Sequence, residues 1–131
     1  VERWQLSNPP ILAIAPIVAS LSIFQAAGMD ALRKKSLSQT AFLKFLLEKE
    51  FADNIDTITP LDARGCQLSL VITNDALNAR GVFEALEKLN VIGDWREPNV
   101  IRVAPVPLYN SFEDVYELSE RLRLAVESGA A

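Results

Sequence analysis

The sequence predicts an α+β domain: a small, mostly antiparallel sheet of three to four strands with helices packed on one face. Helical patterns towards both ends of the chain enclose segments with strand-like alternation, and a short turn separates the last two of these strands. The 131 residues suffice for one domain, predicted to span 1–131, and 50% of them are hydrophobic, which is typical of a globular protein.

Two helices are expected in the first part of the chain. Residues 4–8 should be extended, because two prolines follow them. Pro16 fits the first turn of a helix and no later position, so the first helix should begin near it and stop at Gly28. Apolar residues at helical spacing predict a second, longer helix from Met29 to Phe51.

The middle of the chain is expected to contain a strand followed by a helix. Residues 66–73 alternate apolar and polar side chains and form the clearest strand of the sequence. Residues 52–60 read as a loop, in which residues 55–59 could form a short strand. The helix that follows is expected over residues 78–89, with its apolar side chains on one side.

The last part of the chain predicts a hairpin and a final helix. Residues 91–95 and 100–104 are expected to be its two strands, and residues 96–99 the turn between them. Ser111 is expected to cap the final helix, because Asp114 follows three residues later in the position of a capping box.

The composition excludes several classes of function. The 13 basic and 17 acidic residues give a net charge of −4, which offers no electrostatic case for binding nucleic acid. One cysteine and no histidine exclude an internal disulfide, a multi-cysteine zinc site and a Ser–His or Cys–His nucleophile pair within this chain, and no metal site is expected. The apolar run 9–19 is too short to span a membrane and resembles no signal peptide, so a cytoplasmic protein is expected.

Arg102 is the first candidate for a binding residue. It lies between apolar strand residues, and prolines 105 and 107 then hold the chain extended up to the final helix. An arginine in a strand can simply face solvent. Its planar fork can also bind a carboxylate or phosphate through two parallel hydrogen bonds, and a proline-stiffened loop would keep such a site rigid. The sequence alone leaves both interpretations open.

Ser7 and Asn8 form a second candidate. Their hydroxyl and amide could recognise the polar edge of a ligand, or they could serve only the backbone of the turn that follows. Cys66 is interpreted as a small buried core residue, because nothing basic and titratable lies near it in the sequence. The lysines all fall on predicted helix faces and are expected to be solvated.

Four segments of this chain resemble the C-terminal part of kynureninase, in the same order and with similar spacing. They are Gln5-Leu6-Ser7-Asn8-Pro9-Pro10-Ile11-Leu12, Ala31-Leu32-Arg33-Lys34-Lys35-Ser36, Arg64-Gly65-Cys66-Gln67-Leu68 and Ile101-Arg102-Val103-Ala104-Pro105-Val106-Pro107-Leu108-Tyr109-Asn110-Ser111-Phe112. The resemblance covers about residues 4–124, and its last segment is the most specific. An ordinary aminotransferase would share the architecture but not that last segment.

The resemblance implies a homodimeric enzyme of the aspartate-aminotransferase fold type that depends on pyridoxal 5'-phosphate. Such an enzyme hydrolyses L-kynurenine to anthranilate and L-alanine, or 3-hydroxykynurenine to 3-hydroxyanthranilate, in tryptophan catabolism and in NAD biosynthesis. The predicted domain then corresponds to the small C-terminal domain of that fold. The family's Schiff-base lysine and the rest of its cofactor site lie upstream, so the resemblance implies no catalytic residue in this chain.

The resemblance also implies roles for residues of this chain. Arg102 would bind the α-carboxylate of the substrate, and Ser7 and Asn8 would lie near its aromatic ring. Support roles fall to three further matching residues, which are Arg64, Tyr109 and Asn110.

The expected partners are therefore a missing large cofactor-binding domain and the second subunit of a homodimer, and the chain alone should be inactive. The alternative is a stand-alone α+β module that binds carboxylates, or docks onto a partner, without any chemistry.

Overall fold

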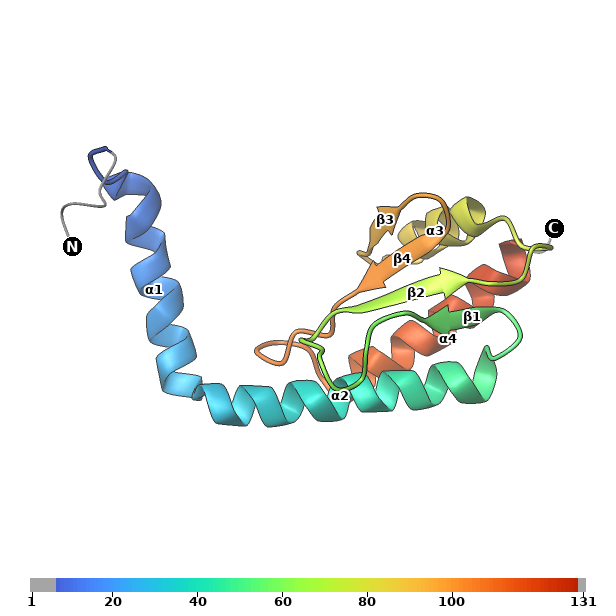
Figure 1. Cartoon of the computed structure of the whole chain (residues 1–131), viewed down its shortest axis with the longest axis horizontal. Coiled ribbons are helices and arrows are strands. Elements are labelled where there is room, and N and C mark those ends of the chain that lie inside the picture. Colours follow the sequence, from blue (N-terminus) through green and yellow to red (C-terminus); the bar gives the residue numbers. More distant parts are fainter. Residues whose placement is uncertain (1–6, 130–131) are drawn as a thin grey trace.

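The computed structural model of the chain describes residues 7–129 and contains four helices and four strands (Figure 1). In chain order the elements are α1 (Ile11–Ala27), α2 (Met29–Glu50), β1 (Ile55–Thr57), β2 (Leu68–Ile72), α3 (Ala79–Lys88), β3 (Asp94–Arg96), β4 (Val100–Val103) and α4 (Phe112–Gly129). The predicted α+β class is confirmed. Residues 4–6 of the segment expected to be extended lie outside the described residues.

The four strands form one open sheet in the order β1-β2-β4-β3, and every neighbouring pair is antiparallel. The predicted hairpin of β3 and β4 is present, and the optional short strand before β2 is β1. Because β4 pairs with both β2 and β3, it lies in the interior of the sheet. A side chain on β4 is therefore flanked by a strand on each side.

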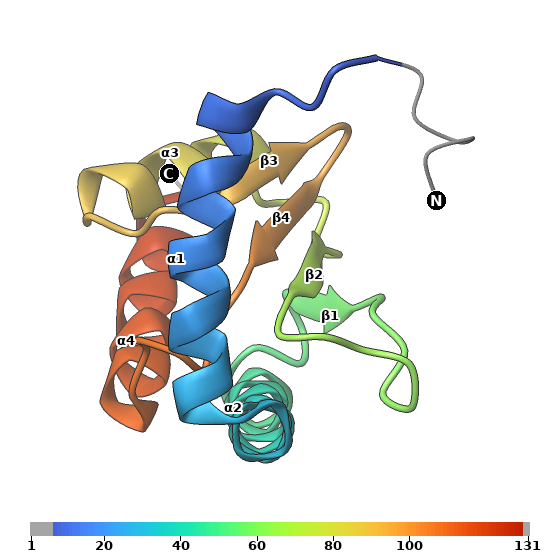
Figure 2. The ribbon, with the colours of Figure 1, turned by 90° about the vertical axis from the view of Figure 1, so that its left-hand side faces the viewer.

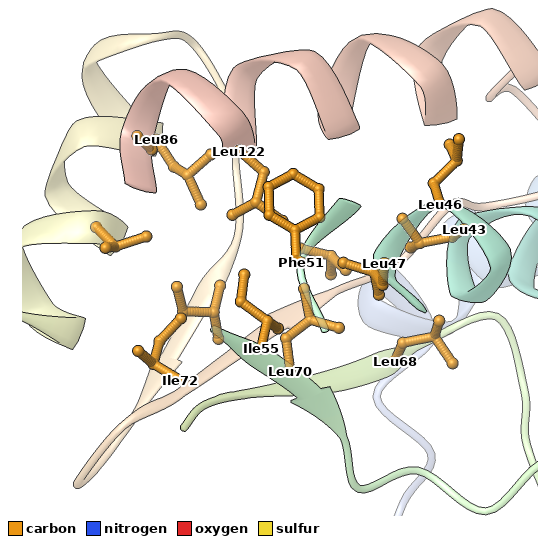
Figure 3. Packing of buried hydrophobic residues seen from close by; sticks show 14 of the residues in the cluster. Leu43, Leu46, Leu47, Phe51, Ile55, Leu68, Leu70, Ile72, Leu86 and Leu122 are labelled. Atoms are coloured by element: carbon orange, nitrogen blue, oxygen red, sulfur yellow. The ribbon is translucent and has the colours of Figure 1, made fainter. Parts of the chain in front are cut away.

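The hydrophobic core lies between one face of the sheet and three helices. Leu68, Leu70 and Ile72 of β2 alternate with half-buried residues, so β2 has one buried face, as its sequence pattern predicts. Figure 3 shows Phe51 at the end of α2 close to Leu122 of α4. The helices α2, α3 and α4 all contribute residues to this one cluster. Figure 2 shows them on the same side of the sheet.

The helix α1 departs from the prediction in two ways. It begins at Ile11, and Pro16 lies inside it rather than in its first turn. The carbonyl of Pro10 accepts hydrogen bonds from the N–H groups of Ala13 and Ile14, both at 3.0 Å, and thereby closes a turn that precedes Pro16. None of its residues is buried, and α1 extends away from the remaining elements (Figure 1). The predicted packing of helices on one face therefore holds for α2, α3 and α4 only.

The first strand of the hairpin, β3, is shorter than predicted, because the residues just before this strand form the end of α3. Asn90 adopts the left-handed conformation with φ 60°. The N–H groups of Asn90 and Val91 then donate to the carbonyls of Glu87 and Leu86 at 3.0 and 2.9 Å. This pair of bonds is a Schellman motif. It fixes Val91 at the helix end, so pairing begins only at Asp94 rather than at Val91.

The start of α4 agrees with the prediction in detail. The hydroxyl of Ser111 accepts a hydrogen bond from the N–H of Asp114 at 3.0 Å, and the carboxylate of Asp114 accepts one from the N–H of Ser111 at 2.7 Å. Each residue thus satisfies a backbone donor of the other, as in a capping box. This cap determines where the loop after β4 ends.

Within residues 7–129 no single helix is long and apolar enough to cross a membrane. The pair α1 and α2 together meets the length and composition expected of a span, but the two helices are bent by 79° at Gly28.

Candidate functional site

Arg102 lies in β4 on the face of the sheet that α2, α3 and α4 leave uncovered. Its neighbours Ile101 and Val103 are buried in the core, so by the alternation of a strand Arg102 belongs to the opposite face. We call this surface the open face. By register and alternation it comprises Asp56, Ser69, Val71, Asp94, Arg96, Val100 and Arg102.

Two strands flank Arg102 directly. Ser69 of β2 is its cross-strand partner on one side, and Asp94 of β3 is its partner on the other. The guanidinium Nη2 of Arg102 donates to Oδ2 of Asp94. Oδ2 of Asp94 also accepts from Nε of Arg96 at 3.2 Å and lies 3.1 Å from its Nη2 in an ion pair. One carboxylate thus contacts two arginines of the open face.

The guanidinium of Arg102 is only partly satisfied. Its side chain is 30% exposed, and its Nε is buried without a hydrogen-bond partner among the described residues. A buried donor without an acceptor costs about 1–3 kcal/mol. The guanidinium of Arg102 is therefore held by Asp94 and not freely solvated. A ligand could contact only its exposed part, because Nε is covered.

The loop after β4 is fastened to α2. Nζ of Lys35 donates to the carbonyl of Pro107 at 2.8 Å, and Nε2 of Gln39 donates to the carbonyls of Asn110 and Ser111 at 2.8 and 3.2 Å. Lys35 is therefore half-buried against this loop rather than solvated, which corrects the prediction for that lysine. These contacts keep the loop after β4 rigid, and that loop begins shortly after Arg102 in the sequence.

Asn110 closes the same loop from within. Its Oδ1 accepts a hydrogen bond from the N–H of Val106 at 2.9 Å, and its own N–H donates to the carbonyl of Val106 at 2.8 Å. These bonds form a tight turn between the proline-containing segment and α4. In this structure Asn110 therefore shapes the loop after β4 and does not lie on the open face.

Arg64 fastens a different segment to α2. Its Nε donates to the hydroxyl of Thr40 at 2.7 Å, its Nη2 donates to the carbonyl of Leu37 at 3.3 Å, and its Nη1 donates to the carbonyl of Leu61. Arg33 of α2 in turn donates to the carbonyl of Arg64 at 2.7 Å. Arg64 thus anchors the chain between β1 and β2 to α2.

Tyr109 lines a cavity of about 430 Å³ between the start of α4, the end of α3 and the loop after β4. Its side chain is 74% exposed. Asn110, Asp114 and Arg121 also line this cavity, but Arg102 does not. The structure therefore places Tyr109 beside a different surface from the open face.

Ser7 and Asn8 are exposed and precede α1, whose beginning lies far from β4 in Figure 1. The structure does not bring them together with Arg102. Cys66 is half-buried and lies outside the core cluster, which corrects its interpretation as a buried core residue. It is a free cysteine just before β2.

Two residues of this site escaped sequence reasoning. In the sequence Asp94 is one of several acidic residues near a turn, and nothing distinguishes it from the others. Only the register of β3 and β4 places it beside Arg102. Gln39 reads as an ordinary polar residue of a long helix, yet its side chain is fully buried under the loop after β4. A polar residue among the apolar positions of the second helix was the one available signal for Gln39.

The described residues do not form a site for pyridoxal phosphate. A Schiff base needs a lysine amine beside the substrate. All five lysines lie on α2 or α3, on the other side of the sheet from the open face. Lys35 and Lys44 are also engaged, with the carbonyl of Pro107 and with Glu48. Residues 7–129 likewise hold no cluster of three acidic or cysteine side chains suited to a metal ion.

Comparison with known proteins identifies the family. The family model described as the kynureninase C-terminal domain matches residues 32–122. The kynureninases of Xanthomonas campestris pv. campestris (strain B100) and Stenotrophomonas maltophilia (strain K279a) are each 50% identical to this chain over 123 residues, which is 92% of the chain. The kynureninase of Xanthomonas oryzae pv. oryzae (strain PXO99A) is 50% identical over 117 residues, or 88% of the chain.

The matched region is a part of these relatives. The chain spans 29% of the length of the first two and 28% of the third. The family match begins at Leu32, which is the first buried residue of α2, so the matched domain coincides with the part of the structure that has a core. With this match and these identities, the chain belongs to the kynureninase family, in the region of that family's C-terminal domain.

Proposed function

We propose that this chain supplies the substrate-carboxylate contact of a kynureninase-like hydrolase that depends on pyridoxal phosphate. The reaction is the hydrolysis of L-kynurenine to anthranilate and L-alanine, or of 3-hydroxykynurenine to 3-hydroxyanthranilate and L-alanine. The observation that carries the proposal is Arg102, a half-buried arginine on the open face, in a chain 50% identical to kynureninases.

Arg102 binds and orients the substrate in this proposal. An arginine presents two parallel N–H donors to a carboxylate and so fixes both its position and its plane. The fastened loop after β4 and the pairing of β4 on both sides hold the backbone of Arg102 in place. A rigid contact of this kind keeps the reacting part of an amino-acid substrate in one orientation.

The remaining parts of the active site belong to polypeptide outside this chain. We assign the cofactor site and the Schiff-base lysine to that polypeptide, because the described residues offer no lysine beside Arg102. We also propose a second subunit, with which the enzyme forms a homodimer. We also propose a cytoplasmic location, which the free cysteine supports.

The surface of α1 supports a covering domain. Its 17 residues include no charged side chain, and Leu12 and Ile11 are 91% and 73% exposed. Apolar residues lie all round this helix, which is typical of a helix buried on every side. The curated relatives are more than three times as long as this chain, and we assign the covering surface to their additional length.

The test is hydrolysis of L-kynurenine and 3-hydroxykynurenine by the longer protein that contains this chain, loaded with pyridoxal phosphate. Arg102→Ala should lower kcat/KM about 100-fold through loss of a charged hydrogen-bond pair, and Arg102→Lys about 10-fold. The matched control is Arg123→Ala, because Arg123 pairs only with Glu120 and Glu127 of its own helix.

The absorbance of bound cofactor should be the same in every variant, which shows that the protein is folded and loaded. If neither substrate is cleaved by the unmodified protein, the proposed reaction is wrong. If either substrate is cleaved and Arg102→Ala is fully active, the reaction stands and the role of Arg102 is wrong.

A further inference from the structure

We propose that Asp94 is a positioning residue for substrate binding, which acts by holding the guanidinium of Arg102. The inference rests on the proposed function of Arg102 as the carboxylate contact. Asp94 accepts from one of the two N–H groups of Nη2 and makes no contact with Nη1, so the second N–H of Nη2 and those of Nη1 remain for a carboxylate. In this arrangement the side chain of Arg102 has a set orientation before any substrate arrives.

The contact between these two residues follows from the fold. Asp94 and Arg102 are direct partners in the antiparallel pairing of β3 and β4, and both belong to the open face. Side chains opposite one another on such a pair lie close enough to interact without any distortion of the strands. The hairpin that brings Asp94 to Arg102 is therefore also the element that determines the direction of the guanidinium.

The side chain of Asp94 is itself restrained. Arg96, two residues along β3, donates from Nε to the same Oδ2 that accepts from Arg102, and its Nη2 forms an ion pair with that oxygen. The side chain of Arg96 is 59% exposed, whereas that of Arg102 is 30% exposed. Arg96 thus holds the carboxylate of Asp94 from the more exposed end, and Asp94 restrains the less exposed Arg102.

Two opposing effects decide how Asp94 changes substrate affinity. A restrained Arg102 loses less side-chain freedom when the substrate binds, which strengthens binding. The negative charge of Asp94 repels an incoming carboxylate, which weakens binding. Because the side chain of Asp94 is 47% exposed, water and salt screen this repulsion. We therefore expect the gain from restraint to be the larger effect.

The test compares Asp94→Ala and Asp94→Asn in the loaded, longer protein. Asp94→Ala should raise KM for the substrate about 10-fold, with kcat changed less than about 2-fold, because a freed arginine must be ordered on binding. Asp94→Asn should raise KM less, by about 3-fold, because an amide oxygen still accepts a hydrogen bond from Arg102. Asp56→Asn is the matched control, because it removes a negative charge from the open face two strands away from β4.

The double variant Asp94→Ala with Arg102→Ala separates positioning from a general effect on structure. If Asp94 acts through Arg102, adding Asp94→Ala to Arg102→Ala should leave KM unchanged. An equal effect of Asp94→Ala in both backgrounds would contradict the proposal. An unchanged or lowered KM in Asp94→Ala alone would also overturn it, since a lowered value means that Asp94 competes with the substrate.

Failure of this inference is distinct from failure of the proposed function. If Arg102→Ala impairs the enzyme and Asp94→Ala does not, only the positioning role is lost. If Arg102→Ala has no effect, the carboxylate role on which the inference rests is wrong. Should Asp94→Ala fail to bind cofactor, Asp94→Asn carries the test, because it preserves the shape of the side chain.

Discussion

The cap of α4 is formed by two residues close together in the sequence, and their hydrogen bonds also determine the charge state of one of them. Ser111 and Asp114 exchange two hydrogen bonds between side chain and backbone. The pKa of Asp114 is lowered from its ordinary value of 3.8, chiefly because the N–H of Ser111 donates to its carboxylate, with smaller contributions from the side chains of Ser111 and Asn110. The carboxylate is thus favoured over the neutral acid in the folded state.

The first prediction concerns the pH dependence of this cap. Because the folded-state pKa lies below 3.8, Asp114 stabilises the fold above pH 3.8 and loses that contribution as the pH falls through the lowered value. Asp114→Asn should therefore be less stable than the unmodified chain at neutral pH, and the difference should shrink as the pH falls below 3.8. Urea unfolding at a series of pH values measures this difference.

The control for this experiment is Glu113→Gln, which removes the other acidic residue of the same first turn. Glu113 makes no capping bond with Ser111, so its replacement should change stability little at any pH. A constant difference between Asp114→Asn and the unmodified chain across the whole pH range would show that the cap does not depend on the charge of Asp114.

At the scale of elements, α2 organises both loops that surround the open sheet. Gln39 and Lys35 hold the loop after β4, and Thr40 accepts a bond from Arg64 in the chain before β2. The long helix therefore has one side in the core and one polar strip under the loops. This strip explains why three polar residues of α2, namely Ser36, Gln39 and Thr40, are buried.

The second prediction concerns Gln39. Gln39→Leu should lower the free energy of unfolding by about 1–3 kcal/mol, because the carbonyls of Asn110 and Ser111 lose their donor. Urea unfolding of the chain gives this value. Ser38→Ala is the control, since Ser38 is exposed and bonds only to the carbonyl of Lys34 in its own helix. An equally stable Gln39→Leu would show that these bonds contribute nothing net.

At the scale of the whole molecule, α1 has no partner within the described residues. Its apolar side chains, together with those at the bend between α1 and α2, form an exposed surface that includes Leu21, Phe24 and Met29. Exposed apolar surfaces of this extent are typical of interfaces or of aggregation. A chain with this helix uncovered should bury it against another copy.

The third prediction is therefore that the isolated chain self-associates through α1. Its weight-average mass in sedimentation equilibrium should rise with concentration, and the double variant Leu12→Glu with Leu21→Glu should reduce that rise. Ile92→Glu is the matched control, because Ile92 is 98% exposed but lies outside α1. A mass that is independent of concentration for the unmodified chain would contradict the prediction.

Local sequence patterns by themselves determined the α+β class, the approximate span of most elements and the cap of α4. These features depend on residues close together in the chain, such as the alternation in β2 and the pair Ser111 and Asp114. The run around Arg102 also identified the main candidate for binding, because its prolines and its resemblance to kynureninase are properties of the sequence.

Tertiary structure alone decided what each candidate residue contacts. The face of the sheet on which Arg102 lies relative to the helices depended on packing, and its pairing with Asp94 depended on strand register. The start of α1 depended on the carbonyl of Pro10, and the length of β3 depended on the turn at Asn90. The physical reason is that packing and hydrogen bonds determine which face of the sheet is covered, which strand residues pair and where a helix begins or ends. These interactions join parts of the chain that the periodicity of the sequence does not relate.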